Sequence, residues 1–317
     1  MQYWPRKRAR RQYARVRSWP ISQEPKLLGF AGYKVGMTHI LFIDNKKTTL
    51  TKGEEINSPV TIIECPPLKA ASIRFYKKNI SGLKLVSEVF AEKPDKELAR
   101  KINLPKNIEK KNEDQKSSIS DIKDYDDIRI LVHTQPKLTG IGKKKAEIFE
   151  MALGGEKESK LQYAKTILGK EIPIKDVFKE GQQVDVHAVT KGKGFQGPVK
   201  RFGLSIRQHK SEKTKRGPGS LGAWRGQGHM MYRVAHAGQM GYHTRTFFNN
   251  WLLKISDKPE EVNQKGGFSH YGIVKNSYIL VKGSVAGPIK RLIRMTAPMR
   301  TNKKIPAEPP SITYIKK

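Results

Sequence analysis

From about Leu28 onward, short apolar runs rich in β-branched residues alternate with glycine and proline. Residues 29–44 predict a strand, a glycine-rich turn and a second strand, and residues 58–64 and 71–77 predict two further strands. Pro59 suits the start of a strand, where its missing N–H removes no ladder hydrogen bond. This pattern predicts a small antiparallel sheet or barrel.

The pattern changes between residues 79 and 175, where helical periodicity is mixed with a strand-like run. Capping and breaking signals predict a short helix opened by Pro94-Asp95 and stopped by Pro105. The other expected elements are a strand at 128–134, helices at 143–153 and 156–168, and an exposed polar loop at 107–121. This block predicts an α/β insertion between strands of the sheet.

Sheet-like alternation then resumes. In residues 181–190 one face carries Val184, Val186 and Ala188, and the other carries Asp185, His187 and Val189. Further strands are expected at 251–255, in a hairpin over 271–287 that turns at Lys275-Asn276-Ser277, at 289–295 and at 312–315.

Residues 191–254 have no clean helical or alternating pattern before about Trp251. Lysine, arginine and glycine dominate this stretch, and its only acid is Glu212. Such a segment repels itself and buries too little apolar surface to offset the entropy of ordering it. Its interspersed aromatic residues nevertheless argue against a plain linker. We expect a polyanion to order it, since phosphates neutralise cations and flat side chains stack on bases. The alternative is a solvated, mobile loop.

Residues 1–20 are also basic and contain no acid, and Tyr3, Trp4, Tyr13 and Trp19 are interleaved with the arginines. A nuclear-localisation-like tag is one interpretation of such a run. Aromatic residues are not needed for that role, so an arm that threads into RNA is favoured.

Composition supports the same partner. The 317-residue chain has a formal net charge of +33 and an isoelectric point near 10.1, which would destabilise a free globular protein. A nucleic acid is the first explanation and an anionic membrane surface the second, but no run of 18 apolar residues exists. Cys65 is the only cysteine and no CxxC occurs, so neither an intrachain disulfide nor a structural zinc site is expected. No signal-peptide-like apolar run opens the chain, so secretion is not expected.

Several motifs occur in one order and together resemble a known family. They are GYKVGMTHI, SPVTIIE, VDVHAVTKGKGFQGPVKRFG, RGPGSLGAW, AHAGQMGYHTRT and SYILVKGSVAG, spread over roughly residues 28–295. The chain is similar to the universal large-subunit ribosomal protein three family in its archaeal form. The resemblance implies a mixed α/β, mainly β fold: a translation-protein-type β-barrel with an α/β insertion and long basic RNA-threading extensions.

The resemblance also implies a function and partners. Family members are structural constituents of the large ribosomal subunit, bind its 23S-type rRNA, support early assembly and reach toward the peptidyl-transferase centre. The expected partners are this rRNA and neighbouring ribosomal proteins, with no membrane and no small-molecule substrate, and the expected location is the cytoplasmic ribosome. No cofactor is expected apart from Mg²⁺ or other cations held by the rRNA.

The expected division follows from pattern and resemblance together. In order, the units are a basic N-terminal arm (1–27), the first part of the barrel (28–78), the α/β insertion (79–178), a barrel strand (179–190), the central basic glycine-rich extension (191–250), the last part of the barrel (251–295) and a C-terminal tail (296–317).

The candidate RNA-binding residues are cations, aromatic residues and polar side chains of the arm and the central extension. They are Arg6, Arg8, Arg10, Arg11, Arg15, Lys191, Lys193, Phe195, Lys200, Arg201, Arg207, His209, Lys213, Lys215, Arg216, Trp224, Arg225, Arg233, His236, Gln239, Tyr242, His243 and Arg245. By the resemblance, Trp224 is the aromatic residue at the tip of the extension and Lys215-Arg216-Gly217 is its basic neighbour. Some relatives carry a methylated glutamine or histidine nearby, but this chain has Ala223 and Lys215 there, so no methylation site is assigned.

Two other interpretations stay open at this stage. Gly140-Ile141-Gly142-Lys143 resembles the turn of a helix-hairpin-helix DNA- or RNA-binding module, in which backbone N–H groups face a phosphate. An RNA-processing enzyme could use paired histidines from His209, His229, His236 and His243. The stretch offers almost no carboxylate to orient a histidine or hold a metal, so catalysis is not favoured.

Overall fold

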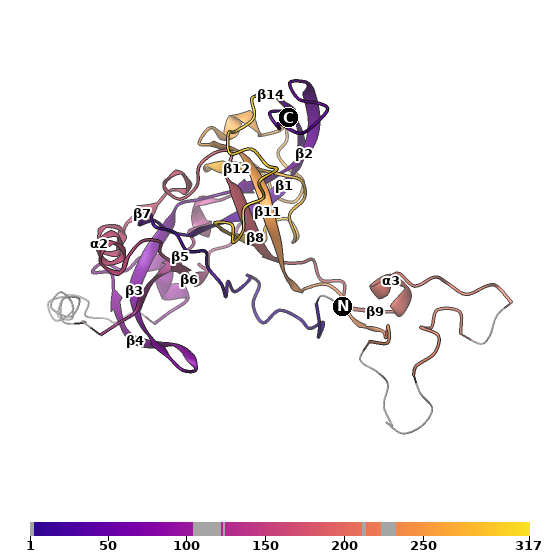
Figure 1. Cartoon of the computed structure of the whole chain (residues 1–317), viewed down its shortest axis with the longest axis horizontal. Coiled ribbons are helices and arrows are strands. Elements are labelled where there is room, and N and C mark those ends of the chain that lie inside the picture. The colour runs from indigo at the N-terminus through magenta and orange to yellow at the C-terminus, as the bar shows by residue number, and fades with distance from the viewer. Residues whose placement is uncertain (1–2, 104–121, 123, 211–213, 223–232) are drawn as a thin grey trace.

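The computed structural model describes residues 3–103, 122, 124–210, 214–222 and 233–317. Within these residues most strands fall into two antiparallel sheets, and one continuous hydrophobic core joins both (Figure 1). A cation-rich segment with β9 and α3 lies apart from the sheets, at the lower right of Figure 1. The protein is therefore mainly β with mixed α/β content.

The larger sheet contains seven strands of the described chain in the order β13-β8-β11-β12-β2-β1-β14, and β13 also pairs with β1. Six of these strands consequently form a closed ring of pairings, with β14 added at the outer end of β1. The strands are β1 (Gly29–Ile43), β2 (Glu55–Glu64), β8 (Gln183–Val189), β11 (Thr244–Ser256), β12 (Tyr278–Lys282), β13 (Leu292–Thr296) and β14 (Ile312–Ile315).

The second sheet runs β4-β3-β5-β6, with β7 paired to the start of β3. The strands are β3 (Leu68–Asn79), β4 (Gly82–Phe90), β5 (Asp127–His133), β6 (Ile148–Ala152) and β7 (Glu171–Ile172). Helix α2 (Lys157–Ile167) lies beside this sheet (Figure 1). Short 3₁₀ turns complete the connections at Lys96–Arg100, Pro136–Leu138, Ile174–Asp176 and Pro259–Glu261.

The core is built from alternate side chains of both sheets. Val184, Val186 and Ala188 of β8 are all fully buried, as their alternation predicts. The largest fully buried side chains include Tyr33, Tyr278, Phe30, Phe42 and Phe75 from the two sheets and Phe178 from the connection between β7 and β8. Removal of this apolar surface from water is the main stabilising contribution to the body, defined here as residues 28–189 and 245–317.

The strand–turn–strand expected over residues 29–44 is wrong, because β1 forms a single strand there. It runs without interruption, and its register with β2 shifts once, between Lys34 and Gly36. Gly32 serves close packing: a Cβ there would lie 2.7 Å from both Cys65 Sγ and the carbonyl oxygen of Glu64. Glycine in this run therefore marks a close approach of two strands.

Two other expectations at the level of single elements are wrong. The predicted helix 143–153 contains strand β6, in which Phe149 and Met151 are buried and which pairs with β5. The predicted hairpin over 271–287 is the single strand β12, because the backbone N–H groups of Lys275 and Asn276 donate to the Glu64 carboxylate and not to a neighbouring strand.

The helix expected to begin at Asp95 is the 3₁₀ turn Lys96–Arg100, whose first turn is capped by the Asp95 carboxylate accepting from the Glu97 N–H at 3.1 Å. Strand β4 was not expected from the sequence. The polar loop predicted at 107–121 lies outside the described residues.

Candidate nucleic-acid interface

The chain leaves the larger sheet through β8 and returns through β11, and these strands are antiparallel neighbours. The segment between them is called the stalk: residues 190–210, 214–222 and 233–244 of the described chain. At its base, β9 (Phe195–Gln196) pairs with β10 (Gly238–Gln239). Backbone hydrogen bonds from Lys193 N to Met240 O and from Met240 N to Gly194 O, at 3.0 and 2.9 Å, join the two sides. The stalk is thus fixed to the body by two strands.

Gly241 permits this narrow crossing of the two sides. Its φ is +74°, and a Cβ at this position would lie 2.1 Å from the carbonyl oxygen of Lys191. No L-amino acid with a side chain fits there without a backbone shift.

Arg201 holds the base of the stalk together. It belongs to the short helix α3 (Pro198–Phe202), and its guanidinium donates to Gln239 O at 3.1 Å and to His236 O at 2.7 Å. A Cβ on Gly238 would come within 3.0 Å of this guanidinium, so the fit is tight. Burial, followed by the neighbouring Arg6 charge, lowers the pKa of Arg201.

The N-terminal arm, residues 3–27, docks on the stalk base (Figure 1). Arg6 donates to the carbonyl oxygen of Arg201 at 3.1 Å and stacks 4.1 Å from the ring centroid of Phe202. The guanidinium of Arg245 stands 4.0 Å from the ring centroid of Tyr3. Arm and stalk base therefore form one surface.

Two hydrogen bonds to backbone carbonyl groups fix this docking. The N–H of Ala9 donates to Tyr242 O at 2.8 Å, and Nδ1 of His243 lies 2.9 Å from Lys7 O. Because a carbonyl oxygen only accepts, this contact places a proton on Nδ1 of the His243 ring. Tyr242 has a φ of +53°, and its ring faces Arg291 of the body at 5.3 Å.

The predicted RNA-binding residues divide into two groups by exposure. The exposed group comprises Arg8, Arg10, Arg11, Arg15, Lys191, Lys193, Phe195, Lys200, His209, Lys215, Arg216 and Arg233. The partly or fully buried group comprises Arg6, Arg201, Arg207, His236, Gln239, Tyr242, His243 and Arg245. Lys213, Trp224 and Arg225 lie outside the described residues.

Several buried members already have partners within the chain. The amide nitrogen of Gln239 donates to Met240 O and Gly241 O at 3.2 and 3.1 Å, and His243 is only 7% exposed. The backbone N–H of Arg207 donates to Lys215 O at 3.2 Å, which brings two predicted cationic positions together. Phe195, in contrast, is 77% exposed and free to stack.

Sequence reasoning missed the residues that fix the arm to the body. Arg294 of β13 is buried, donates to Ala14 O at 3.1 Å and to Glu150 O at 2.7 Å, and lies 4.4 Å from the ring centroid of Phe149. Burial lowers the pKa of Arg294 to about 10. The only available signal was an arginine inside an apolar strand.

Charge separates the stalk and the arm from the rest of the molecule. No acid occurs in residues 3–23 or in the described residues of the stalk. In the body, several cations pair with acids, such as Arg74 with Glu88 at 3.1 Å and Lys160 with Asp127 at 3.2 Å. Excess positive charge per residue is therefore highest on stalk and arm.

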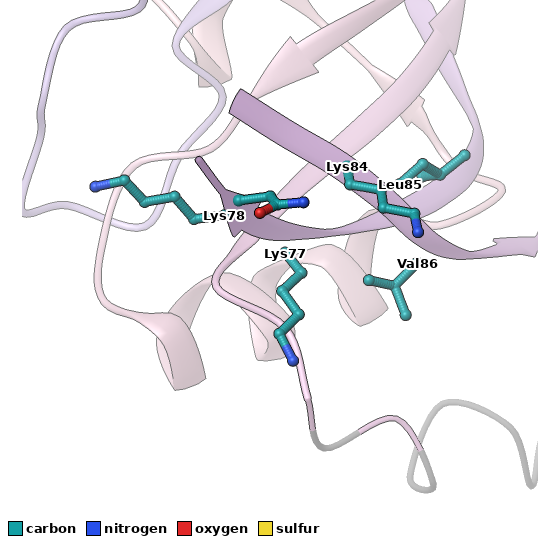
Figure 2. A pocket seen from close by; sticks show the side chains of 6 residues that line it. Lys77, Lys78, Lys84, Leu85 and Val86 are labelled. Carbon is teal, nitrogen blue, oxygen red and sulfur yellow. The ribbon is translucent and has the colours of Figure 1, made fainter. Parts of the chain in front are cut away.

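The structure does not favour the alternative interpretations. Gly140–Lys143 leads into strand β6 and not into a helix, and Lys143 pairs with Glu147. A hollow on the β3–β4 hairpin is lined by Lys77, Lys78, Asn79, Lys84, Leu85 and Val86 (Figure 2). This lining offers no carboxylate and no imidazole for acid–base chemistry.

Metal-binding clusters and membrane-spanning helices are both absent from the described part of the chain. No group of three or more histidine, cysteine, aspartate or glutamate side chains there is arranged to hold a metal ion. No helix in that part has the length and apolar character needed to cross a bilayer.

A β-sheet body with a cationic stalk and arm that are almost free of acids is typical of proteins that bind a polyanion. Comparison with known proteins gives the family: residues 1–316 match ribosomal protein L3, and the chain belongs to that family. A large ribosomal subunit protein uL3 of Methanobrevibacter smithii is 49% identical over 317 residues, covering 98% of this chain and 93% of its own length. The uL3 proteins of Methanosphaera stadtmanae and Archaeoglobus fulgidus are 50% and 46% identical, covering 98% and 94% of this chain and 93% and 90% of their own lengths.

Proposed function

We propose that this chain is a structural constituent of the large ribosomal subunit, acts in translation and binds large-subunit 23S-type rRNA. The observation that carries the proposal is the cationic surface of the described stalk and of residues 3–23 of the arm, which contain no acid, on a chain of the ribosomal protein L3 family. Its role is structural and not enzymatic, as is that of the family. Lysine and arginine neutralise phosphates largely without reading sequence, so specificity comes from RNA shape.

We further infer that the closed ring of six strand pairings is a translation-protein-type β-barrel. The pairing of β13 with β1 supports this, because it leaves neither strand as a free edge of the ring. The division expected from the sequence assigns residues 28–78, 179–190 and 251–295 to the barrel and residues 79–178 to the α/β insertion. Within it, β3 (Leu68–Asn79) pairs in the second sheet, and β11 joins the ring from Thr244. The arm (1–27) and the extension (191–250) enter the rRNA, and the tail (296–317) returns to β1 through β14.

The exposed group of predicted residues provides the phosphate contacts. Arg8, Arg10 and Arg15 project from the arm, and Lys191, Lys193, Lys200, Lys215 and Arg216 project from the stalk. Phe195 offers a flat face for stacking. Trp224 is assigned to the extension tip near the peptidyl-transferase centre, and early rRNA binding supports subunit assembly.

The other partners are neighbouring proteins of the large subunit, and the location is the cytoplasmic ribosome. No cofactor is assigned to the protein itself. Mg²⁺ or other cations at the interface are assigned to the rRNA, which needs counterions wherever lysine and arginine do not neutralise it.

The test is release from the particle by salt. The protein is expected to co-sediment with large subunits and to dissociate only at high salt. With about eight phosphates neutralised, log K for the isolated protein on rRNA should fall against log salt with a slope of roughly −6 to −7. A flat salt dependence, or sedimentation apart from the subunit, would contradict the proposal.

A further inference from the structure

Three arginines from different segments meet where the arm docks on the stalk. Arg6 comes from the arm, Arg201 from α3 and Arg245 from the second residue of β11. The guanidinium carbons of Arg6 and Arg201 lie 4.1 and 5.0 Å from the centroid of the same Phe202 ring. Arg245 contacts the same arm, because its guanidinium lies 4.0 Å from the ring centroid of Tyr3; the Arg6 charge also contributes to lowering the pKa of Arg245, after the larger effect of burial.

The described residues provide no counter-charge for this cluster. No carboxylate among them pairs with Arg6, Arg201 or Arg245. Their hydrogen bonds within the chain go to backbone carbonyl oxygens: Arg6 to Arg201, Arg201 to His236 and Gln239, and Arg245 to Thr244. Carbonyl groups orient a guanidinium but do not neutralise it, so three partly buried like charges remain unbalanced.

Unused donors remain at this site. In these bonds Arg6 and Arg245 use only one Nη atom each, and Arg201 uses Nε and one Nη. Nε of Arg6 is covered from water without a partner among the described residues, and so is Nε2 of His236. Covered polar atoms of this kind cost free energy unless a hydrogen-bond partner arrives.

We propose that a single RNA backbone phosphate binds at this junction and is contacted together by Arg6, Arg201 and Arg245. The inference rests on the proposed function and names one ligand group within it. A phosphate fits because its non-bridging oxygens accept from several planar guanidiniums at once and its charge offsets their repulsion. The bound phosphate fastens the arm to the stalk, since its contacts come from both segments.

A double-mutant cycle on rRNA binding tests whether the contacts share one phosphate. Full-length protein is titrated onto large-subunit rRNA over a range of KCl concentrations. Arg6→Gln and Arg245→Gln are each expected to weaken binding roughly tenfold and to reduce the salt slope by roughly 0.9. The affinity of the double variant is expected to fall only roughly 10–20-fold, and its salt slope is expected to fall no further than that of either single variant, because the same phosphate contact is lost once.

A matched pair controls for charge removal. Arg10→Gln also removes one arm arginine, but Arg10 is exposed. In the double variant of Arg10→Gln and Arg245→Gln, the two single losses of affinity should multiply, and the salt slope should fall by the sum of the two single reductions. Far-UV circular dichroism and the thermal midpoint should match wild type for every variant compared.

The outcomes separate the two proposals. If wild-type protein binds rRNA with a steep salt slope while Arg6→Gln and Arg245→Gln combine by multiplication, the shared phosphate is refuted and the rRNA-binding function stands. If wild-type protein shows no salt-dependent binding, the function itself fails.

Discussion

The body and the stalk are stabilised by different physical means. In the body, the two sheets share one core, with side chains such as Tyr33, Phe30 and Phe42 shielded from water. In the described stalk only Gly241 and His243 are buried. The body thus folds by removing apolar surface from water, whereas the stalk holds its base through backbone hydrogen bonds and the Arg201 contacts.

Charge follows the same division. Acids of the body neutralise nearby cations, as in the pairs of Arg74 and Lys160 with their carboxylates. The stalk concentrates positive charge without any acid in its described residues. One chain therefore contains a part stabilised by its own core and internal ion pairs, and a part whose described residues have no internal counter-charge. A substitution confined to one part should therefore leave the properties of the other part unchanged.

The largest contrast is expected from the same substitution made in each part. Trp251 is buried, its ring lies edge-on to Phe42 at 6.1 Å, and its Nε1 donates to Gly181 O at 3.0 Å. Trp251→Ala should cost about 3–5 kcal/mol of unfolding free energy because it leaves a cavity and an unpaired carbonyl. Trp224→Ala should leave the urea midpoint of the free protein unchanged.

The Trp224 variant should instead alter peptidyl transfer or drug sensitivity of assembled subunits, where a lost stacking contact is worth about 1–3 kcal/mol. Equal losses of stability in the two variants would remove the division between body and stalk.

A buried carboxylate provides the next test. Glu64 is fully buried, and its oxygens accept from the hydroxyl of Tyr271, from the backbone N–H groups of Lys275 and Asn276, and from the Asn276 amide. Glu64→Leu leaves these donors without an acceptor, so the unfolding free energy should fall by about 3 kcal/mol. Glu64→Gln keeps an acceptor oxygen, so its unfolding free energy should fall by less.

The salt slope of rRNA binding shows whether the effect of Glu64→Leu is confined to the body. Measured below the melting temperature, it should equal that of wild type. Stability within 1 kcal/mol of wild type, or an altered slope, would contradict a role confined to the body.

Acid should weaken the body through His187. Its nitrogens lie 2.9 and 3.2 Å from the hydroxyls of Thr246 and Thr296. Burial, and secondarily the Arg294 charge, lower the pKa of His187 to about 4 from 6.5. Because the unfolded chain binds the proton more readily, the stability linked to this histidine is fully present above pH 6.5 and is lost as the pH falls toward 4.

At pH 5 this loss reaches up to about 2 kcal/mol. The measurement is the urea midpoint from pH 7 to pH 5 for wild type and His187→Gln. The variant should show the shallower decline, and parallel curves would mean that His187 is not the titrating group.

Whether an element can be predicted from the sequence depends on whether its local pattern or its tertiary pairing determines it. Strand β8 was predictable, because Val184, Val186 and Ala188 alternate and all are buried. Strand β6 was not, because the lysines before it and its short apolar run suit a helix equally well, and only pairing with β5 decides.

For the site, the cationic character of arm and stalk followed directly from composition. The contact between Arg6 and Arg201 did not, since it joins residues 195 positions apart in two segments without periodicity. Buried Arg294 was missed for a similar reason: the residues that accept its hydrogen bonds, Ala14 and Glu150, are brought to it only by the tertiary fold.

The smallest expected effect is the sharpest test of where the charge acts. Lys200 of α3 and Lys170, which follows α2, are both exposed lysines, one on the stalk and one on the body. Lys200→Gln should reduce the salt slope of rRNA binding by roughly 0.9, the value for one lost phosphate contact, while leaving the melting temperature unchanged. Lys170→Gln removes the same charge and should change neither quantity. Equal reductions of slope in both variants would mean that net charge alone attracts the RNA, whereas a loss only at Lys200 locates the contact on the stalk.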